Sequence, residues 1–141
     1  MLTKNRASWT LGVGVLAVFF VSSACTNIAG DCGNEVLKEV ASPSGKMKAV
    51  IFQRDCGATT GFSTQVSVIS KDEKLPDEGG NAFAADTDHG EASSGQSGGP
   101  EVEVSWLSES ELLVKHDTRA RALQHSPSPG NVRILYETFA K

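Results

Sequence analysis

The sequence predicts an all-β fold, a small twisted antiparallel meander of about five to seven strands stapled by one disulfide. Three observations support this prediction. Short segments rich in Val, Ile and Phe recur along the chain, as is typical of strands. Clusters of Pro, Gly and Ser separate these segments. Finally, Cys32 and Cys56 lie symmetrically about the first of these clusters.

A β-hairpin is predicted around the turn at 42–46, which reads Ser-Pro-Ser-Gly-Lys. Pro43 presets φ for an early turn position, and Gly45 can adopt the positive φ that a tight reversal needs. The segments 35–41 and 46–54 have the composition of strands. We therefore expect two antiparallel strands joined by a short turn.

The register of this hairpin predicts a disulfide. If Ser42 faces Lys46, then Cys32 falls opposite Cys56. Directly opposed residues have Cα atoms roughly 4.5–5.5 Å apart, which is within disulfide range. The bond would close a loop of about 25 residues, which chain entropy values at roughly 3–4 kcal/mol. Two unpaired thiols are the alternative in a reducing compartment.

Later segments also have strand patterns. Apolar and polar side chains alternate over 62–68, which predicts a half-buried strand. Further strands are predicted at 81–85, 102–106, 112–115 and 132–136. Ser108 and Glu111 also match a helix capping box, so a helix over about 109–124 is an alternative.

A mobile loop is predicted at about 71–100, because much of this segment is rich in Gly, Ser and acidic residues. The predicted organisation is then a signal peptide at 1–24, a lipid-anchored tether at 25–34 and a single β-domain at 35–141.

The N-terminus has the pattern of an export signal. Lys4 and Arg6 precede an apolar run at 11–21, which is short for a membrane span, although an uncleaved anchor helix is an alternative. The segment Val-Ser-Ser-Ala-Cys resembles a bacterial lipobox, which implies lipidation of Cys25. Ser22 stands where that motif usually has Leu, so cleavage to a secreted product is the other outcome.

The cysteine count favours lipidation. Three cysteines is an odd number, and an unpaired exported cysteine needs an explanation. A lipid on Cys25 leaves Cys32 and Cys56 as a pair in an oxidising compartment. We therefore expect an exported protein, anchored to the membrane of the cell envelope through Cys25 and facing the periplasm or the exterior.

The charge excludes one class of partner. Removal of Lys4 and Arg6 with the signal takes the net charge from −4 to about −6. Nucleic-acid binding needs a basic surface, so we expect no nucleic-acid partner.

Two groups of side chains have the residue types of catalytic or metal sites. Asp86, Asp88, His89 and Glu91 supply possible metal ligands, but no full calcium-loop pattern follows, and we expect a solvated acidic loop with no metal or cofactor. His116-Asp117 is a poor basis for a catalytic triad, because adjacent residues of a strand face opposite ways. His125 lies in a Ser/Pro-rich stretch and is expected at the surface.

The loop after the first hairpin is the predicted interaction site. Its candidate residues are Arg54, Asp55, Thr59, Thr60 and Phe62. Asp55 is expected to accept hydrogen bonds from the backbone of the following turn. A loop shaped only to pass the disulfide is the structural alternative.

The segment 35–70, with Arg-Asp-Cys-Gly-Ala-Thr-Thr-Gly-Phe-Ser at its centre, resembles a group of small exported bacterial proteins of unknown function. The hairpin predicted at 102–115 is similar to theirs too. The resemblance implies an exported domain, often a lipoprotein, and no activity. We therefore expect a non-catalytic binding or structural β-domain with an envelope protein or glycan as partner. The alternatives are a secreted inhibitor-like domain and a metal-dependent hydrolase that uses 86–91.

Overall fold

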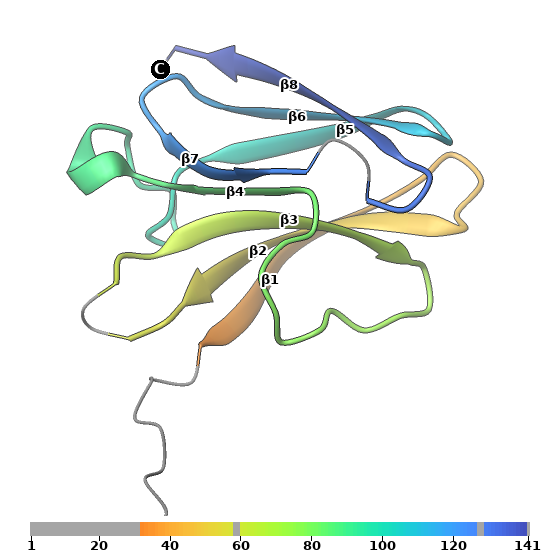
Figure 1. Cartoon of the computed structure of the whole chain (residues 1–141), viewed down its shortest axis with the longest axis horizontal. Helices are drawn as coiled ribbons and strands as arrows, with labels where there is room; N and C mark the ends of the chain where they lie inside the picture. Colours follow the sequence, from red (N-terminus) through yellow and green to blue (C-terminus); the bar gives the residue numbers. More distant parts are fainter. Residues whose placement is uncertain (1–31, 58–59, 127–128, 141) are drawn as a thin grey trace, which may run out of the picture.

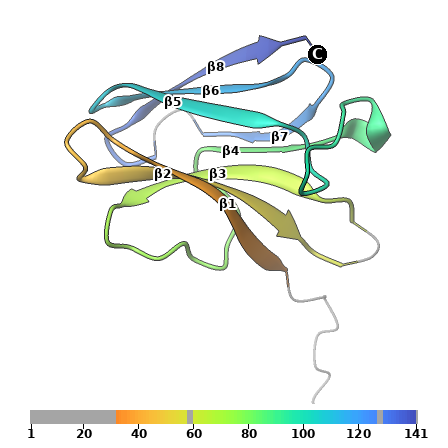
Figure 2. The ribbon, with the colours of Figure 1, turned by 180° about the vertical axis from the view of Figure 1, so that it is seen from behind.

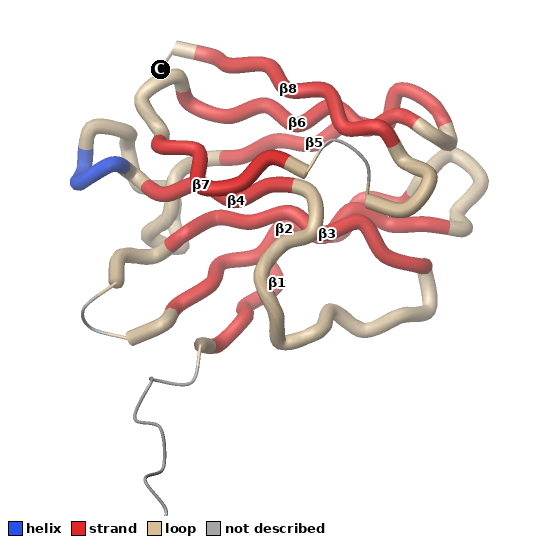
Figure 3. The backbone as a smooth tube through the Cα atoms, viewed as in Figure 1, coloured by secondary structure: helices blue, strands red, loops and turns tan. Residues whose placement is uncertain are grey.

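A computed structural model describes residues 32–57, 60–126 and 129–140, which form eight strands and one short 3-10 turn (Figure 3). The elements are β1 Gly33–Ala41, β2 Met47–Asp55, β3 Ser63–Ser70, β4 Phe83–Asp86, η1 Asp88–Gly90, β5 Val102–Ser108, β6 Glu111–Asp117, β7 Arg121–His125 and β8 Arg133–Phe139. The predicted signal peptide, Cys25 and most of the tether lie outside these residues. β1 begins at Gly33, so the last two residues of the predicted tether belong to the sheet.

The strands form two open sheets that pack face to face (Figure 1). One has the order β1-β2-β3-β4-β7 and the other the order β5-β6-β8. The predicted all-β class with antiparallel sheets and one disulfide is confirmed. The strands number eight rather than five to seven, and β8 pairs with β6 in parallel.

The first hairpin contains a one-residue bulge. Near the turn, Ala41 pairs with Lys48 and Ser42 N donates to Met47 O, so the pairing is one residue off the predicted Ser42–Lys46 register. The register shifts at Leu37, and beyond it Gly33 pairs with Asp55, as predicted. A bulge inserts one unpaired residue into one strand, and here it restores the expected register.

The restored register brings the cysteines together. Cys32 and Cys56 form a disulfide, with their Cα atoms 4.0 Å apart. The predicted pairing is confirmed, although the uniform register from which it was argued is wrong. Without the bulge, the pairing at the turn would place Gly57 opposite Cys32.

The main core lies between the two sheets. Its buried side chains include Ile51, Val66, Phe83, Leu112 and Ile134. Two polar side chains at the edge of the core also tie the sheets together. Trp106 Nε1 donates to Val40 O at 2.9 Å, and Tyr136 Oη donates to Ala82 O at 2.8 Å. The first bond joins a side chain of the smaller sheet to β1, and the second joins another such side chain to the residue before β4.

The outer face of the five-stranded sheet is covered as well. Val50, Phe52 and Ile69 form a second buried cluster, against which Leu75 packs. The segment 71–80 carries Leu75 across this face, so β2 and β3 are buried on both sides (Figure 1). The strand predicted at 62–68 is confirmed as β3, but the prediction that it is half-buried is wrong.

Polar side chains of β3 can be buried without a large energetic cost, because they form hydrogen bonds with the covering segment. Gln65 Oε1 accepts from Gly80 N, and Ser67 Oγ accepts from Asn81 N. The side chain of Asn81 also bonds both the N–H and the C=O of Val68, at 2.8 and 2.9 Å. The amide thus takes the place of a neighbouring strand where β4 does not reach.

The alternative helix over 109–124 does not form, because β6 and β7 occupy this region. Asp117 shapes the corner between the two strands. Its buried carboxylate accepts from the backbone N–H of Arg119 and from the guanidinium of the same residue, at 2.8–3.1 Å. This corner sends β7 to the other sheet, and the sequence analysis predicted no strand there.

The predicted loop at 71–100 contains β4, η1 and the contacts that cover the sheet. Its mobility stays a prediction. No helix within the described ranges is long and apolar enough to cross a membrane.

We expect the double substitution Cys32→Ser with Cys56→Ser to lower the stability of the domain by roughly 3–4 kcal/mol, because the unfolded chain regains the freedom of a loop of about 25 residues. Urea denaturation of the variant and of the oxidised wild-type protein measures the difference. Wild-type protein under reducing conditions is the matched control and should resemble the variant. An unchanged midpoint in the variant would contradict the stabilising role of the bond.

Candidate functional site

The predicted interaction loop lies at the disulfide end of the five-stranded sheet. Arg54 and Asp55 are the last residues of β2, and Phe62 directly precedes β3. Thr59 lies outside the described residues. As expected, Asp55 Oδ1 accepts from a following backbone group, Gly57 N, at 2.9 Å. Thr60 N and Oγ1 both donate to the carbonyl of Gly57.

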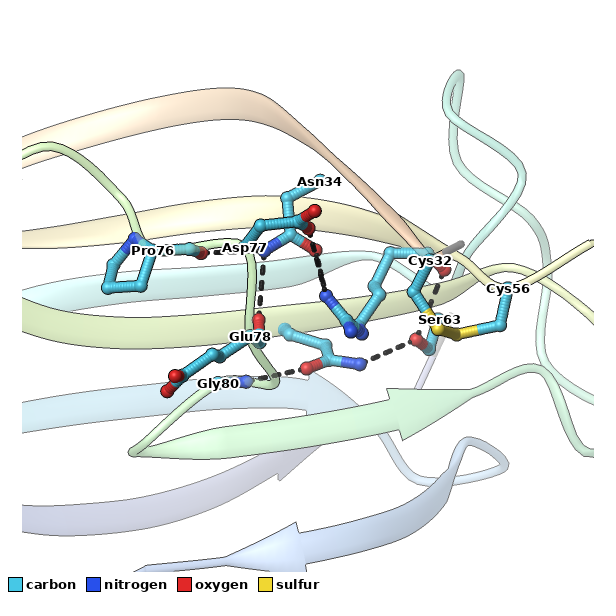
Figure 4. A network of polar contacts seen from close by, with 10 residues as sticks. Cys32, Asn34, Cys56, Ser63, Pro76, Asp77, Glu78 and Gly80 are labelled. Carbon is cyan, nitrogen blue, oxygen red and sulfur yellow. Dashed lines mark hydrogen bonds and ion pairs between the residues drawn. A yellow bond between two sulfur atoms is a disulfide. The ribbon is translucent and has the colours of Figure 1, made fainter. Parts of the chain in front are cut away.

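Arg54 is committed to contacts inside the protein. Its Nη1 donates to Asn34 Oδ1 at 2.7 Å and lies 3.5 Å from Asp77 Oδ1, and its side chain is 16% exposed. Figure 4 shows Asn34 reaching the carbonyls of Pro76 and Glu78 beside the disulfide. Arg54 therefore helps to fasten the covering segment to the strand ends, and little of it is presented to a partner.

Phe62 supports a small hairpin formed by residues 94–100. Ser94 and Pro100 form a bridge, and Gly95 N donates to Gly99 O at 2.8 Å. A Cβ at Gly98, where φ is +92°, would lie 2.6 Å from the Phe62 ring. The hairpin thus packs on Phe62, which remains 42% exposed.

Gly99 places the same hairpin on β3. A Cβ at this position would lie 2.4 Å from Thr64 Oγ1 and 2.9 Å from Thr64 N, so only glycine fits without rearrangement. Thr64 Oγ1 donates to Pro100 O at 2.7 Å and secures the contact. The glycines that suggested mobility thus have a packing function.

A groove of about 710 Å³ lies between this hairpin and the edge of the five-stranded sheet. We call it the β1 groove. The sheet contributes Leu37, Lys38, Ile51 and Thr64, and the hairpin with the start of β5 contributes residues of 94–97 and 100–102. The volume is within the range of ligand sites, and the lining is mixed apolar and polar.

The bulge in β1 aims two consecutive side chains into the β1 groove. Val36 and Glu39 line a separate hollow on the outer face of the sheet, with Leu75. Leu37 and Lys38 line the β1 groove on the inner face. Neighbouring residues of a regular strand point to opposite faces, so the pair shares a face because of the bulge. Leu37 is 41% exposed there.

The acidic stretch that suggested a metal site is engaged with arginine. Both oxygens of Asp86 accept from Arg121, and Asp86 Oδ1 accepts from Asp88 N at 2.9 Å. Burial alone would raise the pKa of Asp86, but the hydrogen bonds from Arg121 and Asp88 and the charges of Arg121 and His89 outweigh it and lower the pKa. No group of three or more metal-ligating side chains occurs within the described part of the chain.

His116 and Asp117 do not form a dyad through their side chains. His116 Nδ1 lies 3.0 Å from the backbone O of Asp117, whose carboxylate is bonded to Arg119. Both contacts belong to the corner between β6 and β7.

An aromatic cluster that was not predicted from the sequence lies between the sheets. The ring of Phe83 stacks on those of His116 and His125, with centroids 4.9 and 5.4 Å apart. His125 also contacts Tyr136 at 4.3 Å. Although His125 is exposed, as predicted, burial of part of its ring and the nearby His116 lower its pKa. The spacing of these residues in the sequence gives no sign of the cluster.

Comparison of the chain with protein-family models, curated protein sequences and solved structures gave no match to any of them. The function is therefore inferred from the residues and the geometry described above. The resemblance to small exported proteins stays a prediction.

We expect Gly99→Ala to destabilise the domain by about 1–3 kcal/mol, because the added methyl forces the 94–100 hairpin away from Thr64. Gly95→Ala is the matched control, since the nearest atom to its Cβ is 3.5 Å away and its φ is not positive. Urea denaturation of both variants measures the difference. Equal stability of the two variants would contradict the close packing of the hairpin.

We expect acidification to weaken the fold through His125. A lowered pKa means that the unfolded chain binds this proton at a higher pH than the folded protein does. The contribution of His125 to the stability of the fold is therefore complete above about pH 6.5, and it is lost as the pH falls through the pKa of His125 in the folded state.

Thermal unfolding between pH 8 and pH 5 measures this effect, and His125→Phe, which keeps a ring but does not titrate, should flatten the curve. The same pH dependence in the variant and the wild type would contradict the assignment to His125.

Proposed function

We propose that this chain is an exported, non-catalytic binding protein, anchored in the cell envelope by a lipid on Cys25. The observation that carries the proposal is the Cys32–Cys56 disulfide at the start of the β-domain. Disulfides persist in exported proteins and are rare in the reducing cytosol. The bond also leaves Cys25 as the unpaired cysteine of an odd set, directly after a lipobox-like segment.

The proposed anchor places the domain close to the membrane. Cys32 lies seven positions after Cys25 in the sequence. A fully extended chain spans at most about 3.3–3.6 Å per residue, so the disulfide end lies within roughly 25 Å of the lipid. A lipoprotein modification with more than one acyl chain would hold the domain there stably. The partner is then an envelope component within that reach.

The β1 groove supports binding as the role of the domain. It joins an exposed apolar side chain, Leu37, to hydroxyl and amide groups of 94–97, and its two walls are fixed by the bulge and by Gly99. A preformed groove loses little conformational entropy when a ligand binds. By contrast, Asp86 of the acidic stretch is paired with Arg121, which disfavours its use as a metal ligand.

Intact-mass measurement of the mature protein tests the anchor. We expect a membrane-bound species that starts at Cys25, carries acyl mass, and gains two alkyl groups only after reduction. Cys25→Ala is the matched control and should abolish the acyl mass while leaving the disulfide in place. A soluble wild-type species without acyl mass, or alkylation of Cys32 and Cys56 before reduction, would contradict the proposal.

A further inference from the structure

We propose that the free edge of β1 accepts an extended polypeptide strand of a partner protein, with one apolar side chain of that strand in the β1 groove. This inference rests on the proposed binding function and specifies how binding occurs. Strand addition uses backbone hydrogen bonds for affinity and pockets beside the edge for specificity.

The backbone of β1 supplies free hydrogen-bonding groups. β1 is the outermost strand of its sheet, and within the described chain β2 is its strand neighbour (Figure 2). Ser42 and Met47 form a hydrogen-bonded pair, and such pairs recur at every second position of an antiparallel ladder. Val40 therefore bonds to β2, and the N–H and C=O of Glu39 point away from it.

The free edge of β1 has a defined extent, which ends near Val40. Trp106 bonds the carbonyl of Val40, which brings a residue of β5 against this end of β1. The residues before Val40 are mostly exposed. The bulge at Leu37 interrupts this stretch, and bulges protect edges against pairing with copies of themselves. The edge is therefore suited to a short, specific strand.

The β1 groove lies where an added strand would place its side chains. Successive side chains of a strand alternate between its faces, so a strand beside β1 directs every second side chain toward the inner face. Leu37, Ile51 and Val102 offer an apolar contact there. Sugar rings usually stack on aromatic side chains, and none of the described residues that line this groove is aromatic. A polypeptide fits this lining better than a glycan does.

The charge of the rim defines the partner further. Lys38 is exposed and lies beside Leu37 on the β1 side of the groove, and Glu101 lies in the wall formed by the hairpin and the start of β5. A complementary strand would carry an acidic side chain facing Lys38, next to its apolar anchor, and no acidic side chain facing Glu101. Opposite charges across an interface favour the correct register and disfavour basic partners.

Photo-crosslinking of the full-length protein in intact cells tests the proposal, with a photoreactive amino acid at position 37. The crosslink is compared in three backgrounds, namely the native Glu39, Glu39→Ala and Glu39→Pro. Both variants lose the ion pair of Glu39 with Lys48, but only proline loses the outward N–H. Proline is tolerated in edge strands where the N–H faces outward. We expect a discrete crosslinked protein that persists with alanine and falls by about tenfold or more with proline.

Melting curves and intact masses of the variants show whether each is folded with its disulfide. If Glu39→Pro does not fold, Lys38→Glu is the second variant, because it reverses the charge of an exposed side chain and should repel an acidic partner strand. Native crosslinking in a folded Glu39→Pro protein, or in Lys38→Glu, would overturn the proposal.

Probes at Phe62 and Leu123 distinguish a failure of strand addition from a failure of the proposed binding function. Leu123 lies on β7, at the opposite edge of the sheet. Crosslinks at these positions without one at Leu37 would overturn strand addition and leave the binding function standing. No crosslink at any of the three positions would overturn both.

Discussion

One extra residue in β1 determines the arrangement of the whole disulfide end. The turn at Ser42 sets a register that is one residue away from the register that the cysteines need, and the bulge at Leu37 corrects it. The same bulge places Leu37 and Lys38 on one face of the sheet. A single backbone irregularity thus connects the closure of the domain to the shape of its groove. Bulges of this kind commonly re-aim side chains at sheet edges.

The second constraint is that the five-stranded sheet is covered on both faces. The smaller sheet packs on one face, and the segment 71–80 crosses the other. Covering the outer face buries polar side chains of β3, and Gln65 and Ser67 accept hydrogen bonds from the segment that covers them. An unpaired buried polar group costs about 1–3 kcal/mol, so the covering segment must satisfy these groups if the sheet is to be stable.

Three arginine side chains hold chain segments in place in this structure. Arg54 fastens the covering segment, Arg119 holds the corner at Asp117, and Arg121 is paired with Asp86. The recognition surface that we propose is the β1 groove with the free edge of its strand. The disulfide and the predicted tether support the proposal of a role close to a membrane. Because these charged residues are engaged in contacts within the protein, they gave no sign of the groove in the sequence.

The sequence by itself determined the all-β class and the first hairpin, and it predicted the pairing of Cys32 with Cys56 to within one residue of register, because turn chemistry and strand composition act over short distances. It also indicated the Asx-type contact of Asp55, which is local. Only the tertiary structure decided the split into two sheets, the position of β7 and the parallel pairing of β8. These features depend on contacts between distant segments, such as the bonds of Tyr136 and Asn81. The groove belongs to the same group, since the bulge, Gly98 and Gly99 create it by close packing that local sequence does not specify.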